Sequence, residues 1–164
     1  MQGTKQIERE VIIHASVQAV WDVLADATLL PQWVPAVQEV EACSAEGEGE
    51  GTVRSCKAEL SGRSGVMVER CVEFTPMSRV AYVVDEESFG MRRMFEHYGF
   101  ALNVASVDSS HTRVTLETHY TPRNWIFNLM NDIMIRRQFE SVCEEIVGGL
   151  KRFVELGLMN SGNA

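Results

Sequence analysis

From about residue 36 to residue 121, hydrophobic and polar residues alternate with a period of two, which is typical of β-strands with one buried face. Clusters rich in glycine, proline, serine or aspartate interrupt this alternation at residues 47–51, 61–65, 76–78 and 108–111. Connections this short join only antiparallel neighbours, because parallel strands need a long crossover. The pattern therefore predicts a meander of six strands, at residues 37–44, 52–59, 66–75, 79–85, 94–107 and 112–121.

The segment before the meander predicts one more strand and two short helices. Residues 6–14 carry β-branched side chains in their second half and are typical of a strand. Pro31 and Pro35 limit the apolar stretch that precedes the meander to about one helical turn. Ser16 is a suitable N-cap for a helix whose apolar residues follow at i, i+3, i+4 and i+7, namely Val17, Val20, Trp21 and Leu24.

The segment after the meander predicts one long helix, over residues 124–156. Pro122 ends the last strand and suits the start of a helix. Gly157 is expected to end the helix, and residues 159–164 are expected to form a flexible tail. The expected apolar stripe of the helix consists of Ile126, Leu129, Ile133, Phe139, Val142, Ile146, Leu150 and Phe153.

These elements predict an α+β fold, in which a seven-stranded curved antiparallel sheet wraps around the long C-terminal helix. The apolar face of the sheet must be covered, and this helix is the only long amphipathic element in the chain. One helix does not fill the concavity of seven strands, so we expect an internal cavity that the short helices close at one end. With 164 residues and no linker or repeat, residues 1–158 are expected to form a single domain.

The segment VWDVLADATLLPQWVPAVQEVE, residues 20–41, resembles the opening of START-like (SRPBCC) domains, in particular the bacterial polyketide cyclase/dehydrase and lipid-transport type. The first strand and the long closing helix match the helix-grip pattern of that superfamily. The resemblance covers nearly the whole chain, but it consists of apolar positions rather than a catalytic signature. Members bind lipids, sterols, quinones, plant hormones or polyketides, and some are enzymes. The resemblance therefore implies a hydrophobic small-molecule ligand and leaves the chemistry open.

Two charged residues share the phase of apolar strand residues and are expected to point into the cavity. Arg70 falls between Val68 and Val72, and Glu96 falls in phase with Tyr98. An unpaired buried charge is costly, so each requires a partner or a ligand. Arg70 is a candidate for holding a carboxylate, carbonyl or phenolate oxygen of a ligand. The alternatives are a structural Arg70–Glu96 ion pair, or charges at strand ends that reach water.

The catalytic candidates are Arg70, Glu96 and Tyr98, because Glu96 with Tyr98 or Tyr82 is a possible acid–base pair for aldol cyclisation or dehydration. Phe89 lies beside Gly90 on a loop that is expected either to gate the pocket or to be an ordinary hairpin. The residues expected to line the ligand pocket, with Trp33 at its mouth, are Trp33, Arg70, Tyr82, Phe89, Glu96, Tyr98, Phe100, Leu116, Thr118 and Tyr120.

Composition limits the partners of the chain. A net charge of −8 disfavours nucleic acid, whose binding depends on neutralising phosphates with Lys and Arg. No window approaches the 18 apolar residues of a membrane span. The N-terminus lacks the apolar run of a signal peptide, and four scattered cysteines without a CxxC pair are typical of reduced thiols. These features predict a cytoplasmic protein.

No motif predicts a metal or a cofactor. The four histidines are scattered, and neither an HExxH sequence nor a Cys/His quartet occurs. The glycine-rich residues 47–51 lack the lysine and the following helix of a phosphate-binding loop, and are expected to form a hairpin turn.

The leading hypothesis is therefore binding or transport of a lipid, a quinone or a polyketide-like molecule in an internal cavity. The first alternative is a polyketide aromatase/cyclase or dehydratase that uses the cavity Arg, Glu and Tyr residues, and the second is a protein-interaction module. The chain is expected to be a monomer or a homodimer.

Overall fold

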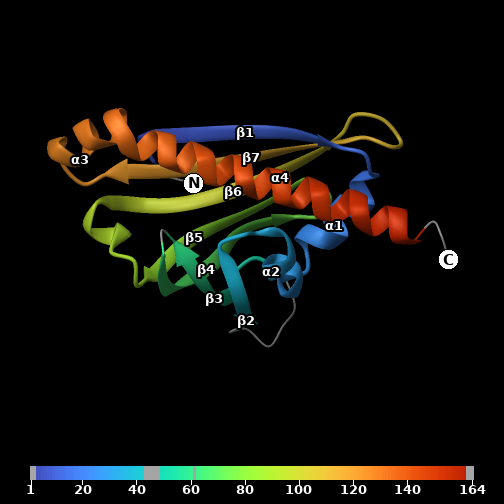
Figure 1. Cartoon of the computed structure of the whole chain (residues 1–164), viewed down its shortest axis with the longest axis horizontal. Coiled ribbons are helices and arrows are strands. Elements are labelled where there is room, and N and C mark those ends of the chain that lie inside the picture. Colours follow the sequence, from blue (N-terminus) through green and yellow to red (C-terminus); the bar gives the residue numbers. More distant parts are fainter. Residues whose placement is uncertain (1–2, 43–48, 61, 162–164) are drawn as a thin grey trace.

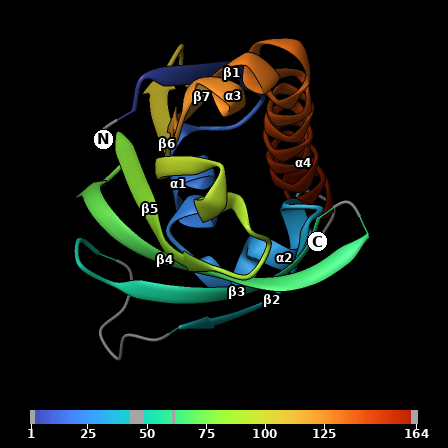
Figure 2. The ribbon, with the colours of Figure 1, turned by 90° about the vertical axis from the view of Figure 1, so that its left-hand side faces the viewer.

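The computed structural model describes residues 3–42, 49–60 and 62–161 and confirms the helix-grip fold. Seven antiparallel strands form one sheet in the order β1-β7-β6-β5-β4-β3-β2. The sheet curves around the interior, and the long C-terminal helix closes the side that it leaves open (Figures 1 and 2). The strands are β1 (Lys5–Ile13), β2 (Val37–Ala42), β3 (Val53–Leu60), β4 (Arg63–Thr75), β5 (Arg79–Glu87), β6 (Phe95–Ser106) and β7 (Thr112–Pro122). The predicted turn at residues 47–51 lies partly outside the described residues.

The two short helical segments follow β1, as expected. The Oγ of Ser16 accepts a hydrogen bond from the backbone N–H of Ala19 and caps α1 (Val17–Leu24). The side chain of Asp26 likewise accepts from the N–H of Thr28 and starts the 3₁₀ turn η1 (Ala27–Leu29), which leads into α2 (Leu30–Trp33). A further 3₁₀ turn, η2 (Met91–Arg93), connects β5 to β6.

The C-terminal helix differs from the prediction in its phase and its end. It consists of α3 (Trp125–Met130), a π-helical turn η3 (Asn131–Ile135) and α4 (Arg136–Ser161). A π-helical turn holds more residues per turn than an α-helix, so the residues before it and after it do not share one stripe. The expected stripe therefore fails before and within the π turn, since Ile126 and Leu129 of α3 and Ile133 of the π turn are exposed. The helix also continues through Gly157.

The buried residues of α4 pack on the concave face of the sheet and on α2. They are Ile135 at the end of the π turn, followed by Cys143, Val147, Leu150 and Val154. Gly149 brings α4 against the backbone of α2, because a Cβ at this position would lie 2.0 Å from the carbonyl oxygen of Trp33.

The alternation along β4 places Arg70 on the outer face of the sheet. The register between β4 and β5 shifts between Val68 and Glu69, and again between Cys71 and Glu73. Glu69 and Cys71 are buried in the interior, while the side chain of Arg70 between them is 43% exposed. The expected inward phase of Arg70 is therefore wrong. Arg70 does share a face with Val68, but that face is the outer one, and only the extra residue Val72 turns Phe74 toward the core.

A bulge in β6 separates Glu96 from the face of Tyr98. The register between β6 and β7 shifts between Glu96 and Gly99, and His97 takes a positive φ of 53° within this segment. Tyr98 faces the interior and stacks on Phe139 of α4, with ring centroids 5.9 Å apart. The Glu96 side chain is 42% exposed, so it does not share the face of Tyr98.

Candidate functional site

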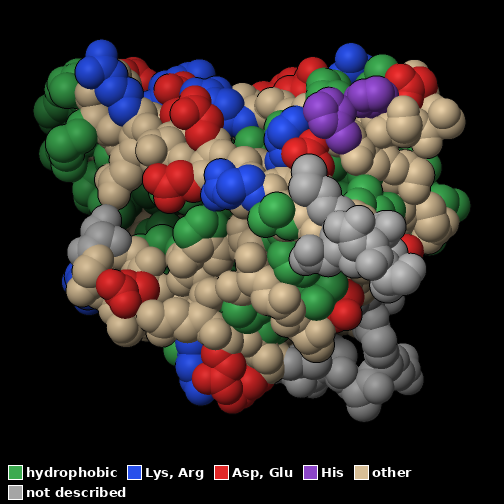
Figure 3. Space-filling view, turned by 45° about the vertical axis from the view of Figure 1, so that its right-hand side comes forward, with side chains coloured by type: hydrophobic (Ala, Val, Ile, Leu, Met, Phe, Trp, Pro, Cys, Tyr) green, Lys and Arg blue, Asp and Glu red, His purple; other side chains and the backbone are tan. Residues whose placement is uncertain are grey.

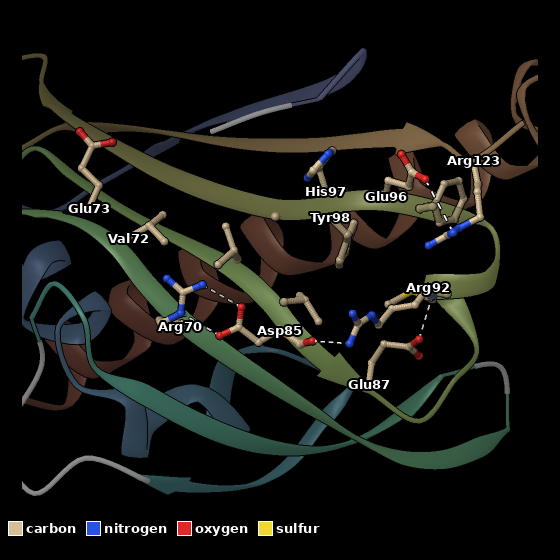
Figure 4. A pocket seen from close by; sticks show the side chains of 15 residues that line it. Arg70, Val72, Glu73, Asp85, Glu87, Arg92, Glu96, His97, Tyr98 and Arg123 are labelled. Carbon is tan, nitrogen blue, oxygen red and sulfur yellow. Dashed lines mark hydrogen bonds and ion pairs between the residues drawn. The ribbon is translucent and has the colours of Figure 1, made fainter.

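A pocket of about 700 Å³ lies where β5 and β6 separate. These two strands pair only from Arg79 opposite Asn103 to Val83 opposite Gly99, although both continue beyond that point. The residues that line the pocket come from both faces of the sheet, so the pocket lies in the split itself (Figure 4). Its lining includes Arg70, Val72 and Glu73 of β4, Val83, Val84, Asp85 and Glu87 of β5, Met91 and Arg92 of η2, Phe95, Glu96, His97, Tyr98 and Gly99 of β6, and Arg123.

The charged groups of the pocket are already paired. Arg70 donates from Nε and Nη2 to the two carboxylate oxygens of Asp85, at 2.8 and 2.9 Å. Arg123 lies 3.7 Å from a carboxylate oxygen of Glu96. The alternative of an Arg70–Glu96 ion pair is therefore wrong, and each of the two residues has a different partner. Both pairs are partly exposed, so they contribute little to stability.

Glu87 and Arg92 fix the β5–β6 loop at the edge of the pocket. The Glu87 carboxylate accepts hydrogen bonds from the backbone N–H groups of Phe89, Gly90 and Arg92, at 2.6–2.8 Å. Burial alone would raise the pKa of Glu87, but these backbone hydrogen bonds lower it overall. The Arg92 guanidinium donates to the backbone carbonyl of Asp85 and so connects η2 to β5 across the split, as Figure 4 shows.

Tyr98 points into the split and supplies a phenol hydroxyl to the pocket (Figure 4). Within the described part of the chain its hydroxyl makes no hydrogen bond, whereas the Tyr120 hydroxyl donates to Oδ1 of Asn131 at 2.7 Å. Burial raises the pKa of Tyr98 above its usual range, so its hydroxyl stays protonated at neutral pH. Tyr98 therefore offers a hydrogen-bond donor on an otherwise aromatic wall.

Behind this wall lies a buried ion pair that the sequence did not predict. Arg54 of β3 and Glu69 of β4 are direct cross-strand partners, and Nε of Arg54 donates to the Glu69 carboxylate at 2.8 Å. The guanidinium also lies 3.8 Å from the ring centroid of Tyr82. Burial alone would lower the pKa of Arg54, but Glu69 and Tyr82 raise it overall. Both charges are over 90% buried, so the interior of the grip is not purely apolar.

The structure brings only three of the ten predicted ligand residues to this pocket, namely Arg70, Glu96 and Tyr98. The others lie elsewhere. Tyr82 stacks on Phe100, and Trp33, Leu116, Thr118 and Tyr120 are buried in the core. Phe89 covers Gly65, whose Cβ, if present, would lie 2.7 Å from its ring. Whether any of these residues contacts a ligand stays a prediction.

Sequence reasoning missed Asp85, Glu87, Arg92 and Arg123 because their roles depend on the separation of β5 and β6, which no local pattern encodes. Arg54 carried a usable signal. It alternates with Cys56 and Ala58 on β3, so the same phase argument that was applied to Arg70 identifies it.

Three further findings on the described residues concern metal binding, membrane-spanning helices and cysteines. In these ranges no three His, Cys, Asp or Glu side chains are grouped so as to hold a metal ion. None of the helices there combines the length and the hydropathy that a bilayer crossing requires. Cys56, Cys71 and Cys143 are buried cysteines in the thiol form, and Cys43 lies outside the described residues.

Comparison with known proteins supports the same architecture. Residues 4–155 match the family described as polyketide cyclase/dehydrase and lipid transport. No curated protein sequence matches the chain significantly.

Several solved structures share the fold at low sequence identity. A START superfamily protein from Mycobacterium smegmatis aligns with a TM-score of 0.76 and 14% identity, over 92% of this chain and 97% of its own. An aromatase/cyclase from Streptomyces sp. R1128 aligns with a TM-score of 0.68 and 19% identity, over 92% and 95%. Norcoclaurine synthase from Thalictrum flavum, in complex with dopamine and hydroxybenzaldehyde, aligns with a TM-score of 0.71 and 16% identity, over 92% and 86%. At these identities the likeness concerns the fold alone.

Proposed function

We propose that this chain, which belongs to the polyketide cyclase/dehydrase and lipid-transport family, binds an amphipathic small molecule in the pocket between β5 and β6. Family and fold both point to a hydrophobic-ligand-binding protein. The observation that carries the proposal is the Tyr98 hydroxyl, which has no partner in the described residues, faces the pocket and lies on an aromatic wall. Pockets of this kind bind ligands by apolar contact and use a few polar groups for orientation.

The pocket favours a ligand with one polar group near an apolar body. Met91, Phe95 and Tyr98 offer apolar and aromatic surface, and the Tyr98 hydroxyl offers a donor to a carbonyl, ether or hydroxyl oxygen. Arg70 and Arg123 already face carboxylates of the protein, so a strongly anionic ligand must displace those partners. A neutral or weakly polar molecule such as a quinone, a polyketide-like ketone or a lipid alcohol fits these conditions.

An enzymatic role has less support than binding. The aromatase/cyclase hypothesis requires Arg70, Glu96 and Tyr98 to act on one substrate. All three line the pocket, but Arg70 and Glu96 are each engaged by another residue of the protein, Asp85 and Arg123. The raised pKa of Tyr98 disfavours its use as a general base and leaves it the role of a hydrogen-bond donor.

The proposal is tested by displacement of the neutral fluorescent dye N-phenyl-1-naphthylamine from the native protein, with a prenylquinone and a saturated hydrocarbon as competitors. We expect the dye to bind and the quinone to displace it. Tyr98→Phe should weaken quinone binding by about 3- to 10-fold, the effect of one neutral hydrogen bond, and leave hydrocarbon binding unchanged. Its melting temperature should stay that of the wild type, because the hydroxyl has no protein partner to lose.

Tyr120→Phe is the matched control, since it removes a hydroxyl that bonds Asn131 rather than the pocket. It should lower the free energy of unfolding by about 1–3 kcal/mol, because buried Asn131 loses its partner, and it should leave quinone affinity unchanged. Absence of dye binding to the native protein, or equal effects of the two substitutions on quinone affinity, would contradict the proposal.

A further inference from the structure

The segment that begins the C-terminal helix exposes an unusual amount of apolar surface. Eleven large hydrophobic residues are exposed among the described residues, and six of them lie within residues 125–134. Figure 3 shows hydrophobic side chains gathered at the end of the molecule that carries α3, with basic side chains beside them. We call these six residues the α3 patch: Trp125 (75% exposed), Ile126 (48%), Leu129 (54%), Met130 (37%), Ile133 (65%) and Met134 (60%).

A patch of this kind costs free energy in water unless something covers it, and contiguous apolar patches on soluble proteins mark interaction surfaces. The other exposed large hydrophobic residues of the described chain are spread over β4, two strand connections and the C-terminal end of α4. Within residues 3–42, 49–60 and 62–161, only the α3 patch combines an exposed Trp with long aliphatic side chains on consecutive helical turns.

Basic residues adjoin this patch although the whole chain carries a net charge of −8. Arg123 precedes α3, and its backbone N–H donates to the carbonyl of Met94, which places the end of η2 with Arg92 and Arg93 beside the start of α3. Arg136 and Arg137 follow the π turn.

The charge near the patch is effectively positive. Arg93 and Arg137 are exposed and make no ion pair with any described residue. The acidic groups nearby are already engaged, since Asp132 faces Lys5 and Glu140 faces Arg9 and Arg136.

The patch also adjoins the pocket. Arg92 and Arg123 both line the pocket, and α3 begins two residues after Arg123. A ligand that passes the mouth of the pocket on this side therefore meets the α3 patch directly.

We propose that the α3 patch docks on the surface of an anionic lipid bilayer. Apolar side chains with a Trp beside arginines match the two layers of such a surface, the acyl region and the negatively charged headgroups. A second copy of this chain fits less well, because a twofold contact through the patch brings the like charges of Arg93 and Arg137 from both copies to one interface. The purpose of the docking, which is ligand exchange with the bilayer, rests on the proposed function. The docking itself does not depend on that function.

The test is co-sedimentation of the full chain with vesicles of phosphatidylcholine alone or with 30% phosphatidylglycerol, at low salt. We expect binding to the anionic vesicles and at least tenfold weaker binding to the neutral ones, with loss of binding as salt screens the arginines. Tryptophan fluorescence gives an independent signal. Trp125 is 75% exposed whereas Trp21 and Trp33 are 5% exposed, so a blue shift on vesicle addition reports Trp125 and should vanish in Trp125→Phe.

Leu129→Ser/Ile133→Ser should reduce binding to anionic vesicles at least tenfold, and Arg93→Gln/Arg137→Gln should reduce its dependence on phosphatidylglycerol. The matched control is Leu156→Ser/Leu158→Ser, two residues of similar exposure at the other end of the helix, which should bind as the wild type does.

Equal binding by the Leu129/Ile133 and Leu156/Leu158 variants, or no binding to anionic vesicles, would overturn the proposal. A dimer in sedimentation velocity that Leu129→Ser/Ile133→Ser dissociates would assign the patch to a second copy instead. Dye binding in vesicle-free buffer, measured on the same variants, separates the two proposals. It should be unchanged if only the docking surface is lost.

Discussion

At the scale of single residues, the Arg54–Glu69 pair is the most consequential feature of the interior. Both side chains are more than 90% buried, and Tyr82 covers the guanidinium. Removing two charges from water is costly, and their attraction repays that cost only while both remain. The pair therefore acts as a unit, in contrast to Arg70 and Asp85, which are opposite charges of similar geometry on the exposed side.

Glu69→Gln should lower the free energy of unfolding by about 3–5 kcal/mol, because Arg54 is left charged and buried without a counterion. Arg54→Met/Glu69→Leu should recover most of this loss. Asp85→Asn, the control on the exposed pair, should cost about 0–1 kcal/mol. Urea unfolding of the three variants measures these differences, and equal losses for Glu69→Gln and Asp85→Asn would show that the interior pair is hydrated.

The error in predicting Arg70 has a definite physical cause. The side-chain period of a strand is two, so a bulge that adds one residue moves every later side chain to the opposite face. In β4 the extra residue is Val72, so Phe74 faces the core while Val68 and Arg70 face outward. In β6 the bulge lies between Glu96 and Gly99 and separates Glu96 from the face of Tyr98. Because a bulge depends on the partner strand, the sequence of β4 alone does not reveal it.

At the scale of elements, the contact between α4 and α2 holds one end of the grip together. Gly149 allows α4 to approach so closely that its missing Cβ would lie 2.0 Å from the carbonyl oxygen of Trp33. The neighbouring Gly148 meets only the end of the flexible Arg152 side chain, at 3.4 Å. Of these two adjacent glycines, Gly149 therefore leaves no room for a Cβ atom, whereas Gly148 does.

Gly149→Ala should destabilise the protein by about 1–3 kcal/mol, because α4 must move away from α2 or strain its backbone. Gly148→Ala should instead be neutral or stabilising by up to about 1 kcal/mol, since alanine is the better helix former. Thermal unfolding of both variants measures the contrast. Similar melting temperatures for the two would show that the α2 contact is loose.

The positions of the strands and helices were predicted more accurately from the sequence than the positions of single side chains. All seven strands and the short helices lie within a few residues of their predicted positions, because alternation, proline positions and the Ser16 cap are local signals. The stripe of the last helix failed at Ile126, Leu129 and Ile133, since a π turn changes the phase without changing the composition.

At the scale of the whole molecule, the sheet and the C-terminal helix both contribute buried thiols to the interior that they enclose. Cys56 and Cys71 lie on the sheet, and Cys143 lies on α4 opposite Thr118, with their sulfur and oxygen 3.4 Å apart. Burial raises the pKa of Cys143, so little reactive thiolate forms there near neutral pH. Thiol reactivity therefore reports whether the sheet and the helix separate.

On a Cys43→Ser background at pH 8, all three thiols should react with a disulfide reagent no faster than the protein unfolds globally. A ligand should slow the reaction further, because it stabilises the closed state. Stopped-flow absorbance with mass spectrometry assigns each site. Fast modification of Cys143 alone would mean that α4 lifts from the sheet while the sheet stays folded.

The π turn Asn131–Ile135 also has a genetic consequence. An extra residue within a helix turns everything before it by about 100°, the angle between successive residues. Deleting one codon within this turn would restore the α-helical period and rotate Trp125 and Leu129 to a different side of the helix without altering either residue. The surface that this family member presents at the mouth of its pocket can thus change in a single insertion or deletion event, while the sheet and the buried half of α4 keep their sequence.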